Sequence, residues 1–173
     1  MLYTNPFFGI LRTLFLFITG RVQFDKSVVG NRIIMKDGKA FTIFRRVDIK
    51  HYLKSEAPEA LFIIRFTPTM ELHKNIRLSR VMLFVFMGFK GFRSKYWCVN
   101  ENSGECQGIY EWDTKADAER YSQSIAIRNM TKRSVPGSIS FEILENTPQA
   151  HSWEIEETEP EVQIQFRQKY GFS

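Results

Sequence analysis

The stretch GECQGIYEWDTKADAERY (residues 104–121) joins a strand to a helix with a very short turn between them. Residues 106–112 contain the aromatic and β-branched side chains that strands favour. The helix that follows is capped by Asp113 or Thr114, and Asp117 lies three residues beyond Thr114, which is the spacing of a capping box. Tyr110 and Trp112 lie two residues apart, so their rings point to the same side of the strand. The surface that these rings face decides how the layers of the fold are arranged.

The segments around this stretch alternate between strand and helix patterns. In chain order they are an apolar strand at 60–68, a helix at 70–87, an alternating strand at 92–99, a polar turn at 100–105, the strand at 106–112, a helix at about 115–132 and an alternating strand at 138–144. The order β-α-β-β-α-β is that of the ferredoxin-like unit, in which helices cover one face of a four-stranded antiparallel sheet. The sequence therefore predicts an α+β fold with a ferredoxin-like domain at residues 59–145.

Two extensions flank the predicted domain. Residues 1–58 contain an apolar helix pattern and then a β-hairpin at 32–49, in which Asp37 and Gly38 form the tight turn. Residues 146–173 form a polar, acidic tail until VQIQF (162–166), whose alternation indicates that the tail can add an edge strand.

The apolar segment NPFFGILRTLFLFITG (residues 5–20) is shorter than the ~20 residues that a membrane span needs. Arg12 lies in its middle, and Asn5 followed by Pro6 is a good start for a helix. We expect a helix that packs on the body of the protein. The alternative is a peripheral membrane contact through residues 6–20.

The charge and the cysteine content limit the possible cellular location and the possible binding partners. Residues 142–173 carry seven glutamates against Arg167 and Lys169, so the net charge of +5 comes from the first 141 residues. A basic body suits an anionic ligand or, alternatively, a solvated surface on which the acidic tail folds back. Cys98 and Cys106 are too few for a disulfide framework and lack the spacing of a zinc site. We expect a reducing, cytoplasmic location, with membrane association as an open alternative.

The helix-free face of the predicted sheet needs a partner or a ligand. If Cys98 pairs with Gly108, one face carries mainly aromatic and small side chains, namely Ser94, Tyr96, Cys98, Gly108, Tyr110 and Trp112. A register shifted by one residue would put Ile109 and Glu111 on that face instead. A largely uncharged aromatic face is too apolar to leave in water, so this pairing predicts a homodimer formed by the helix-free faces.

The segments GFRSKYWCV, GIYEWDTKADAERY and SVPGSISFEIL resemble the dimeric α/β-barrel superfamily, and within it the proteins similar to antibiotic-biosynthesis monooxygenases. The resemblance covers about residues 59–145 and implies two sheets packed face to face, with a small-molecule cavity in each protomer. It also implies oxidation, cyclisation or decarboxylation of aromatic, polyketide-like compounds, often without a cofactor. Heme-degrading relatives carry a histidine about ten residues after the tryptophan, where this chain has Ser122.

The candidate site residues follow partly from this resemblance. As catalytic candidates we take His73, near the start of the first helix, Arg65, a cation inside an apolar strand, and Tyr110, a hydrogen-bond donor for an oxyanion. Each has a plainer reading: His73 as a surface residue, Arg65 paired with Glu111 or Glu142, and Tyr110 as an interface ring. The ligand-binding candidates are Trp112, Tyr96, Ser94 and Gly108. No cluster with metal-ligand spacing and no phosphate-binding glycine loop occurs in the sequence, so we expect neither a metal nor another cofactor.

Three functions remain open from the sequence. The first is an enzyme with cofactor-independent monooxygenase-like or cyclase-like chemistry on a hydrophobic, aromatic small molecule. The second is a non-catalytic ligand-binding or interaction protein on the same dimeric fold. RNA binding is a remote third, because KGFRSKYW resembles an aromatic RNA-binding motif but opens the second strand instead of the third, and we expect no nucleic-acid partner. If Trp112 lines the ligand site, its replacement by alanine should weaken binding more than folding.

Overall fold

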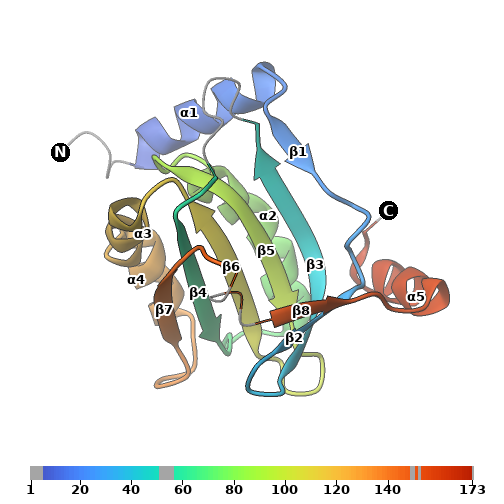
Figure 1. Cartoon of the computed structure of the whole chain (residues 1–173). Helices are drawn as coiled ribbons and strands as arrows, with labels where there is room; N and C mark the ends of the chain where they lie inside the picture. Colours follow the sequence, from blue (N-terminus) through green and yellow to red (C-terminus); the bar gives the residue numbers. More distant parts are fainter. Residues whose placement is uncertain (1–5, 51–56, 149–150, 152, 173) are drawn as a thin grey trace.

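The computed structural model describes residues 6–50, 57–148, 151 and 153–172 (Figure 1). Its helices are α1 (Pro6–Ile18), α2 (Leu72–Phe86), α3 (Lys115–Ser122), α4 (Ile125–Lys132) and α5 (Pro160–Tyr170). Its strands are β1 (Val22–Phe24), β2 (Arg32–Met35), β3 (Ala40–Ile49), β4 (Ala60–Phe66), β5 (Phe92–Val99), β6 (Cys106–Trp112), β7 (Ser140–Glu145) and β8 (Trp153–Glu156).

The eight strands of the described residues form one antiparallel sheet in the order β7-β4-β6-β5-β3-β2-β8, with β1 also paired to β3. Within it, β4-α2-β5 and β6-α3-α4-β7 are two split βαβ units, because β6 lies between β4 and β5, and β4 lies between β6 and β7. The predicted ferredoxin-like α+β fold is therefore confirmed. The predicted hairpin is present as β2 and β3, and β3 joins it to the sheet by pairing with β5.

The helix expected at about residues 115–132 is divided into α3 and α4. Thr114 caps α3 as predicted, since its Oγ1 accepts a hydrogen bond from the main-chain N–H of Asp117 at 3.2 Å. A second cap follows at Ser124, whose hydroxyl accepts from the N–H of Ile127 at 3.4 Å and starts α4. Serine at this position competes with the helical hydrogen bonds of the preceding turn, which explains the interruption.

The register expected between β5 and β6 is wrong by one residue. Trp97, not Cys98, lies opposite Gly108, and Val99 pairs with Cys106. The turn sets this register, because the main-chain N–H of Asn100 donates to the carbonyl of Glu105 at 2.8 Å. Gly104, with φ of +73°, supplies the left-handed residue that closes the turn. As a result Gly108, Tyr110 and Trp112 face the helices, whereas Ser94 and Tyr96 lie on the other face with Ile109 and Glu111.

The helix-free face is covered by the sheet itself. β2 and β8 continue beyond β3 and curl back, so that β8 crosses in front of β5 and β6 in Figure 1. Leu144 of β7 and Trp153 of β8 both pack on one apolar cluster that we call the second core: Ile33, Met35, Phe41, Ile43, Ile63, Tyr96, Cys98 and Ile109. The face that the sequence offered for dimerisation therefore has different members and is buried within one chain.

The edge strand expected at residues 162–166 is also wrong. VQIQF lies in α5 and not in an edge strand; the edge strand of the tail is β8, ten residues earlier in the chain. Pro160 at the start of α5 and Gly171, whose φ of +68° ends it, are the start and stop signals that outweigh the alternating pattern. Glu161 in the first turn and Lys169 in the last also suit the helix dipole.

The N-terminal helix packs on the protein by one side, as predicted. Thr13 is buried there, and its hydroxyl donates to the main-chain carbonyl of Phe84 in α2 at 2.7 Å. Gly88 lies so near α1 that a Cβ added to it would be 2.1 Å from the carbonyl oxygen of Gly9. The cap expected at Asn5 lies outside the described residues. α1 has 13 residues, and in the described part of the chain no helix has the length and apolarity to cross a membrane.

Candidate functional site

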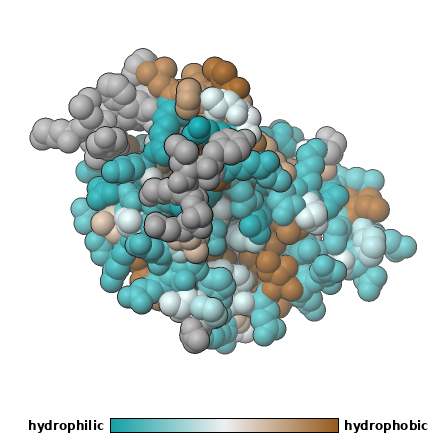
Figure 2. Space-filling model, turned by 45° about the horizontal axis from the view of Figure 1, so that its top comes forward, coloured by the Kyte–Doolittle hydropathy of each residue, from teal (hydrophilic) through white to brown (hydrophobic). Residues whose placement is uncertain are grey.

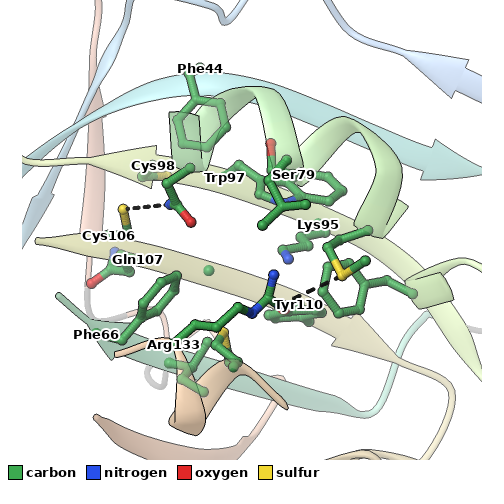
Figure 3. Close-up of a pocket in the computed structure, with 17 residues that line it drawn as sticks. Phe44, Phe66, Ser79, Lys95, Trp97, Cys98, Cys106, Gln107, Tyr110 and Arg133 are labelled. Atoms are coloured by element: carbon green, nitrogen blue, oxygen red, sulfur yellow. Dashed lines mark hydrogen bonds between the residues drawn. The ribbon is translucent and has the colours of Figure 1, made fainter. Parts of the chain in front are cut away.

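A cavity of about 50 Å³ lies between α2 and the helix-covered face of the sheet (Figure 3). Its floor is formed by buried residues of β5 and β6, among them Lys95, Gly108 and Tyr110. Half-buried residues, including Met82 and Arg133, line the side nearer to solvent. The cavity exceeds the ~10–15 Å³ that one water molecule needs, so it has room for a few water molecules.

Lys95 is the unusual residue of this cavity. Only 3% of its surface is exposed. Its Nζ lies 4.0 Å from the ring centroid of Phe86 and 4.1 Å from those of Trp97 and Tyr110. Among the described residues no hydrogen bond or ion pair reaches this nitrogen, so three aromatic faces are its immediate surroundings.

Burial sets the protonation of Lys95. Loss of water around the amine, and then the charge of Arg45, hold the pKa of Lys95 well below its usual value of 10.5. The three rings favour the ammonium form through cation–π attraction, which offsets part of this effect. The amine therefore exchanges a proton within the cavity more readily than a surface lysine would.

Gly108 makes room for this arrangement. A Cβ at this position would lie 2.8 Å from Cε2 of Tyr110 and 3.3 Å from Cε of Lys95. The side chains that approach Gly108 closely are therefore those of Tyr110 and Lys95, together with Ile64.

Polar groups around the cavity are few and fixed. Asn75 donates to the thiol of Cys106 at 3.3 Å, and Arg133 Nη2 lies 3.7 Å from the sulfur of Met82 (Figure 3). The hydroxyl of Tyr110 accepts a hydrogen bond from Tyr121 at 2.9 Å. Burial raises the pKa of Tyr110, so its phenol stays protonated and can act as a donor.

The sequence-predicted site residues do not come together. Tyr110 and Gly108 line the cavity, and Trp112 lies on the same face. However, Trp112 is fully buried among Phe92, Tyr110 and Tyr121 and is not part of the cavity lining.

Tyr96, Ser94 and Arg65 lie on the opposite face of the sheet. Tyr96 is covered by the guanidinium of Arg46, whose Cζ is 4.5 Å from the ring centroid. Ser94 donates to Glu111 at 2.6 Å. A shared polar network therefore occupies this end of the helix-free face.

Arg65 has a carboxylate partner, but not the one expected. It forms an ion pair with Asp37 in the β2–β3 turn, and its Nε donates to Gln107 at 2.7 Å. The ion pair holds the hairpin against the sheet, and the hydrogen bond to Gln107 links β4 to the neighbouring strand β6. His73 is in the first turn of α2 with half of its side chain exposed, and its Nε2 lies 3.5 Å from Glu71. The sequence-based catalytic candidates are thus distributed over three separate environments.

Lys95 was missed by the sequence reasoning. In the structure it lies with Trp97 on the helix side of β5. A lysine that shares a buried strand face with a tryptophan is the signal that could have identified it, because lysine is almost never fully buried without a reason.

Both thiols should be unreactive in the folded protein. Burial raises the pKa of Cys98 far above its usual value and that of Cys106 to about 12, the latter partly offset by the Asn75 hydrogen bond. Because the thiolate is the reactive form, we expect no reaction with Ellman's reagent until the protein is unfolded, when both thiols should react. Rapid labelling of one thiol in the folded protein would contradict this burial.

Comparison with solved structures finds similarity over about three fifths of the chain. A monooxygenase-like protein from Listeria innocua is 13% identical, with a TM-score of 0.47 over 64% of this chain and 66% of that one. A ferredoxin-fold protein of Listeria monocytogenes, described as related to antibiotic biosynthesis monooxygenases, is 15% identical with a TM-score of 0.46, over 62% and 64%. An anthrone oxidase-like protein is 11% identical with a TM-score of 0.45, over 61% and 53%.

This chain is similar to ferredoxin-fold, monooxygenase-like proteins. These proteins belong to the group that the sequence was found to resemble. The chain spans less than two thirds of the length of each of the three solved structures. No family model and no curated protein sequence matches it. In the described part of the chain, no three His, Cys, Asp or Glu side chains are grouped so that they could hold a metal ion.

Proposed function

We propose that this protein is a small-molecule enzyme that oxygenates an aromatic compound carrying an acidic C–H bond, with dioxygen as second substrate. The observation that supports this proposal is Lys95, a buried amine without an acidic partner at the floor of an aromatic cavity. An amine with a lowered pKa is a good general base near neutral pH.

In the proposed reaction, the neutral Lys95 amine takes the acidic proton from carbon and leaves a delocalised carbanion. The new ammonium is stabilised by the faces of Phe86, Trp97 and Tyr110, and it lies beside the anion that it has generated. The Tyr110 phenol is a further donor for the developing oxyanion, which keeps this residue in the role expected from the sequence.

The remaining steps need only dioxygen. The carbanion gives two electrons to dioxygen as the C–O bond forms, and the resulting peroxide takes the proton back from Lys95. The second hydrogen on the same carbon then leaves as a proton while the O–O bond breaks and releases hydroxide, so water is lost and a carbonyl group remains. The lysine returns to its neutral form, so the cycle balances without a bound cofactor.

The substrate class follows from the cavity lining. Aromatic and methionine side chains surround the amine, which suits a flat apolar molecule. The cavity is smaller than the ~300 Å³ of common ligand sites, so entry requires movement at its solvent side. Met82 and Met130 line the cavity, and methionine has the flexible side chain that allows such movement.

The second candidate function is a non-catalytic binding protein on the same fold. Oxygen consumption separates the two. With anthrone, whose ring methylene is acidic, the proposed enzyme should consume one dioxygen per molecule at a rate above spontaneous oxidation. Tight binding of anthrone without added oxygen consumption would favour the second candidate.

Assembly as a homodimer stays a prediction, but on a different surface. The face expected to pair is filled by the second core. The outer edge of β7, beside the half-exposed ring of Phe141, offers an open strand edge for pairing two copies. Sedimentation equilibrium at micromolar concentration should give twice the chain mass of 20.4 kDa, whereas a species of the chain mass alone would contradict the dimer.

A further inference from the structure

A second, larger hollow of about 410 Å³ lies beyond Arg45, bounded by α1, β1, α2 and the residues that follow α5. Five phenylalanines line it, together with five basic side chains and one carboxylate, that of Asp25. We call it the arginine groove after Arg45, Arg80 and Arg167, which project from three separate elements. It shares only Phe44 with the cavity of Lys95.

Arg45 is the most buried cation of the groove, with 9% of its surface exposed. Its Nη1 donates to the Ser79 hydroxyl at 2.9 Å, and its guanidinium lies over the rings of Phe44 and Trp97. Among the described residues no carboxylate lies within ion-pair distance of it. Burial, and then the like charge of Arg80, lower the pKa of Arg45 to about 10.

Arg80 and Arg167 also lack carboxylate partners within the described chain. Arg80 donates to the main-chain carbonyl of Gly171 at 2.9 Å. Arg167 donates to the carbonyls of Val29 at 3.2 Å and Lys26 at 3.0 Å. Three guanidinium groups thus line one groove, and the hydrogen-bond acceptors that they contact are neutral. Arg45 is the buried one of the three, and burying its charge is costly unless an anion compensates.

We infer that the arginine groove binds an anionic amphiphile. Its acidic head, a carboxylate or phosphate, is held by Arg45 and Arg80, since guanidinium groups match the paired oxygens of such heads. Its apolar body lies against the phenylalanines, in a volume within the range of small-molecule sites. This inference does not depend on the chemistry proposed for Lys95.

The amphiphile can come from two sources, a free carboxylic acid or the headgroup of an anionic membrane lipid. The second source is favoured by α1, which contributes Phe17 to the groove and exposes a row of large apolar side chains beside it: Ile10, Leu11, Leu14, Phe15 and Ile18. Figure 2 shows hydrophobic side chains gathered at the top of the molecule, over α1. Such a surface can enter the interface of a bilayer without crossing it.

Titration calorimetry with decanoate and decanol tests the first source. Decanoate should bind, and decanol, which has the same body without the charge, should bind at least tenfold more weakly. Arg80→Gln should weaken decanoate binding about tenfold, the size expected for one charge-assisted hydrogen bond. Arg77→Gln removes the same charge from the exposed side of the same helix and should change the affinity less than twofold.

Co-sedimentation with vesicles tests the second source. Vesicles of equal parts phosphatidylglycerol and phosphatidylcholine should retain the protein more strongly than pure phosphatidylcholine, with the same dependence on Arg80 but not on Arg77. Binding to vesicles without binding to decanoate would assign the site to a lipid headgroup. The inference is overturned if decanol binds as well as decanoate, if both variants weaken binding equally, or if neither source binds.

Discussion

Lys95→Met should lose at least about 100-fold in anthrone oxygenation, the lower range for removal of a general base, while the folded protein becomes more stable. Methionine has a similar length and packs well against Phe86, Trp97 and Tyr110. It also removes a buried charge, and replacing buried charges with apolar side chains can stabilise a protein by ~1–4 kcal/mol. Opposite changes in turnover and in urea midpoint are a combination that simple damage to the fold cannot produce.

The gain in stability caused by Lys95→Met should decrease as the pH rises. In the unfolded chain the lysine has a pKa of about 10.4, and burial lowers the pKa of Lys95 in the folded state. Between the two values the unfolded chain binds more protons, so the stability of the natural protein rises with pH. The advantage of Lys95→Met is therefore largest below the folded pKa and shrinks as the pH approaches 10. Turnover of the natural protein should rise as the pH passes the folded pKa of Lys95 and level off above it, because only the neutral amine acts as base.

Lys115→Met is the matched control, since Lys115 is exposed at the start of α3 and far from the cavity lining. It should change neither turnover nor the pH dependence of stability. Full activity of Lys95→Met, or a loss of stability in that variant, would remove the basis for the proposed enzyme.

Trp112→Ala should lower the free energy of unfolding by ~3–5 kcal/mol, the usual result of truncating a buried tryptophan. Its ring is fully buried, with centroids of Tyr121 at 5.0 Å and Phe92 at 5.7 Å. This expectation reverses the one drawn from the sequence, where the ring was placed beside a ligand. A small drop in urea midpoint together with a large fall in anthrone turnover would restore the sequence-based reading.

Trp112→Phe separates packing from hydrogen bonding at the same position. The indole Nε1 is buried without a hydrogen-bond partner in the described structure. Phenylalanine keeps most of the ring contacts and removes this unsatisfied donor, so its loss should be about 1 kcal/mol or less. Equal losses for the alanine and phenylalanine variants would mean that the indole contributes more than its packing.

The order of strands and helices in the central domain could be predicted from the sequence, because each element has its own periodicity and its own start or stop signal. Which side chains of β6 face the helices could not be predicted in this way. It depends on how Asn100 and Glu105 close one turn, and a slip of one residue exchanges the two faces of a strand.

In the site, too, some features follow from the local sequence, and others depend on residues that are distant in the chain. The orientation of Lys95 follows from the alternation of β5, but its lack of a partner depends on which side chains α2 and β6 bring to it. Similarly, the partner of Arg65 is Asp37, which is 28 residues away on a hairpin whose placement over the sheet depends on pairing of β3 with β5.

The contacts of α5 have a consequence for the order in which the protein is made. Thr158 donates to the carbonyl of Gly30 at 2.9 Å across 128 positions of the chain, and Arg167 reaches Val29. During translation, residues near Gly30 leave the ribosome long before α5 exists, so they wait for their partner while the rest of the sheet folds. The arginine groove is complete only after α5 has docked, and any ligand bound there stabilises the docked position of α5 near α1. Occupancy of the groove would therefore report that synthesis has passed α5.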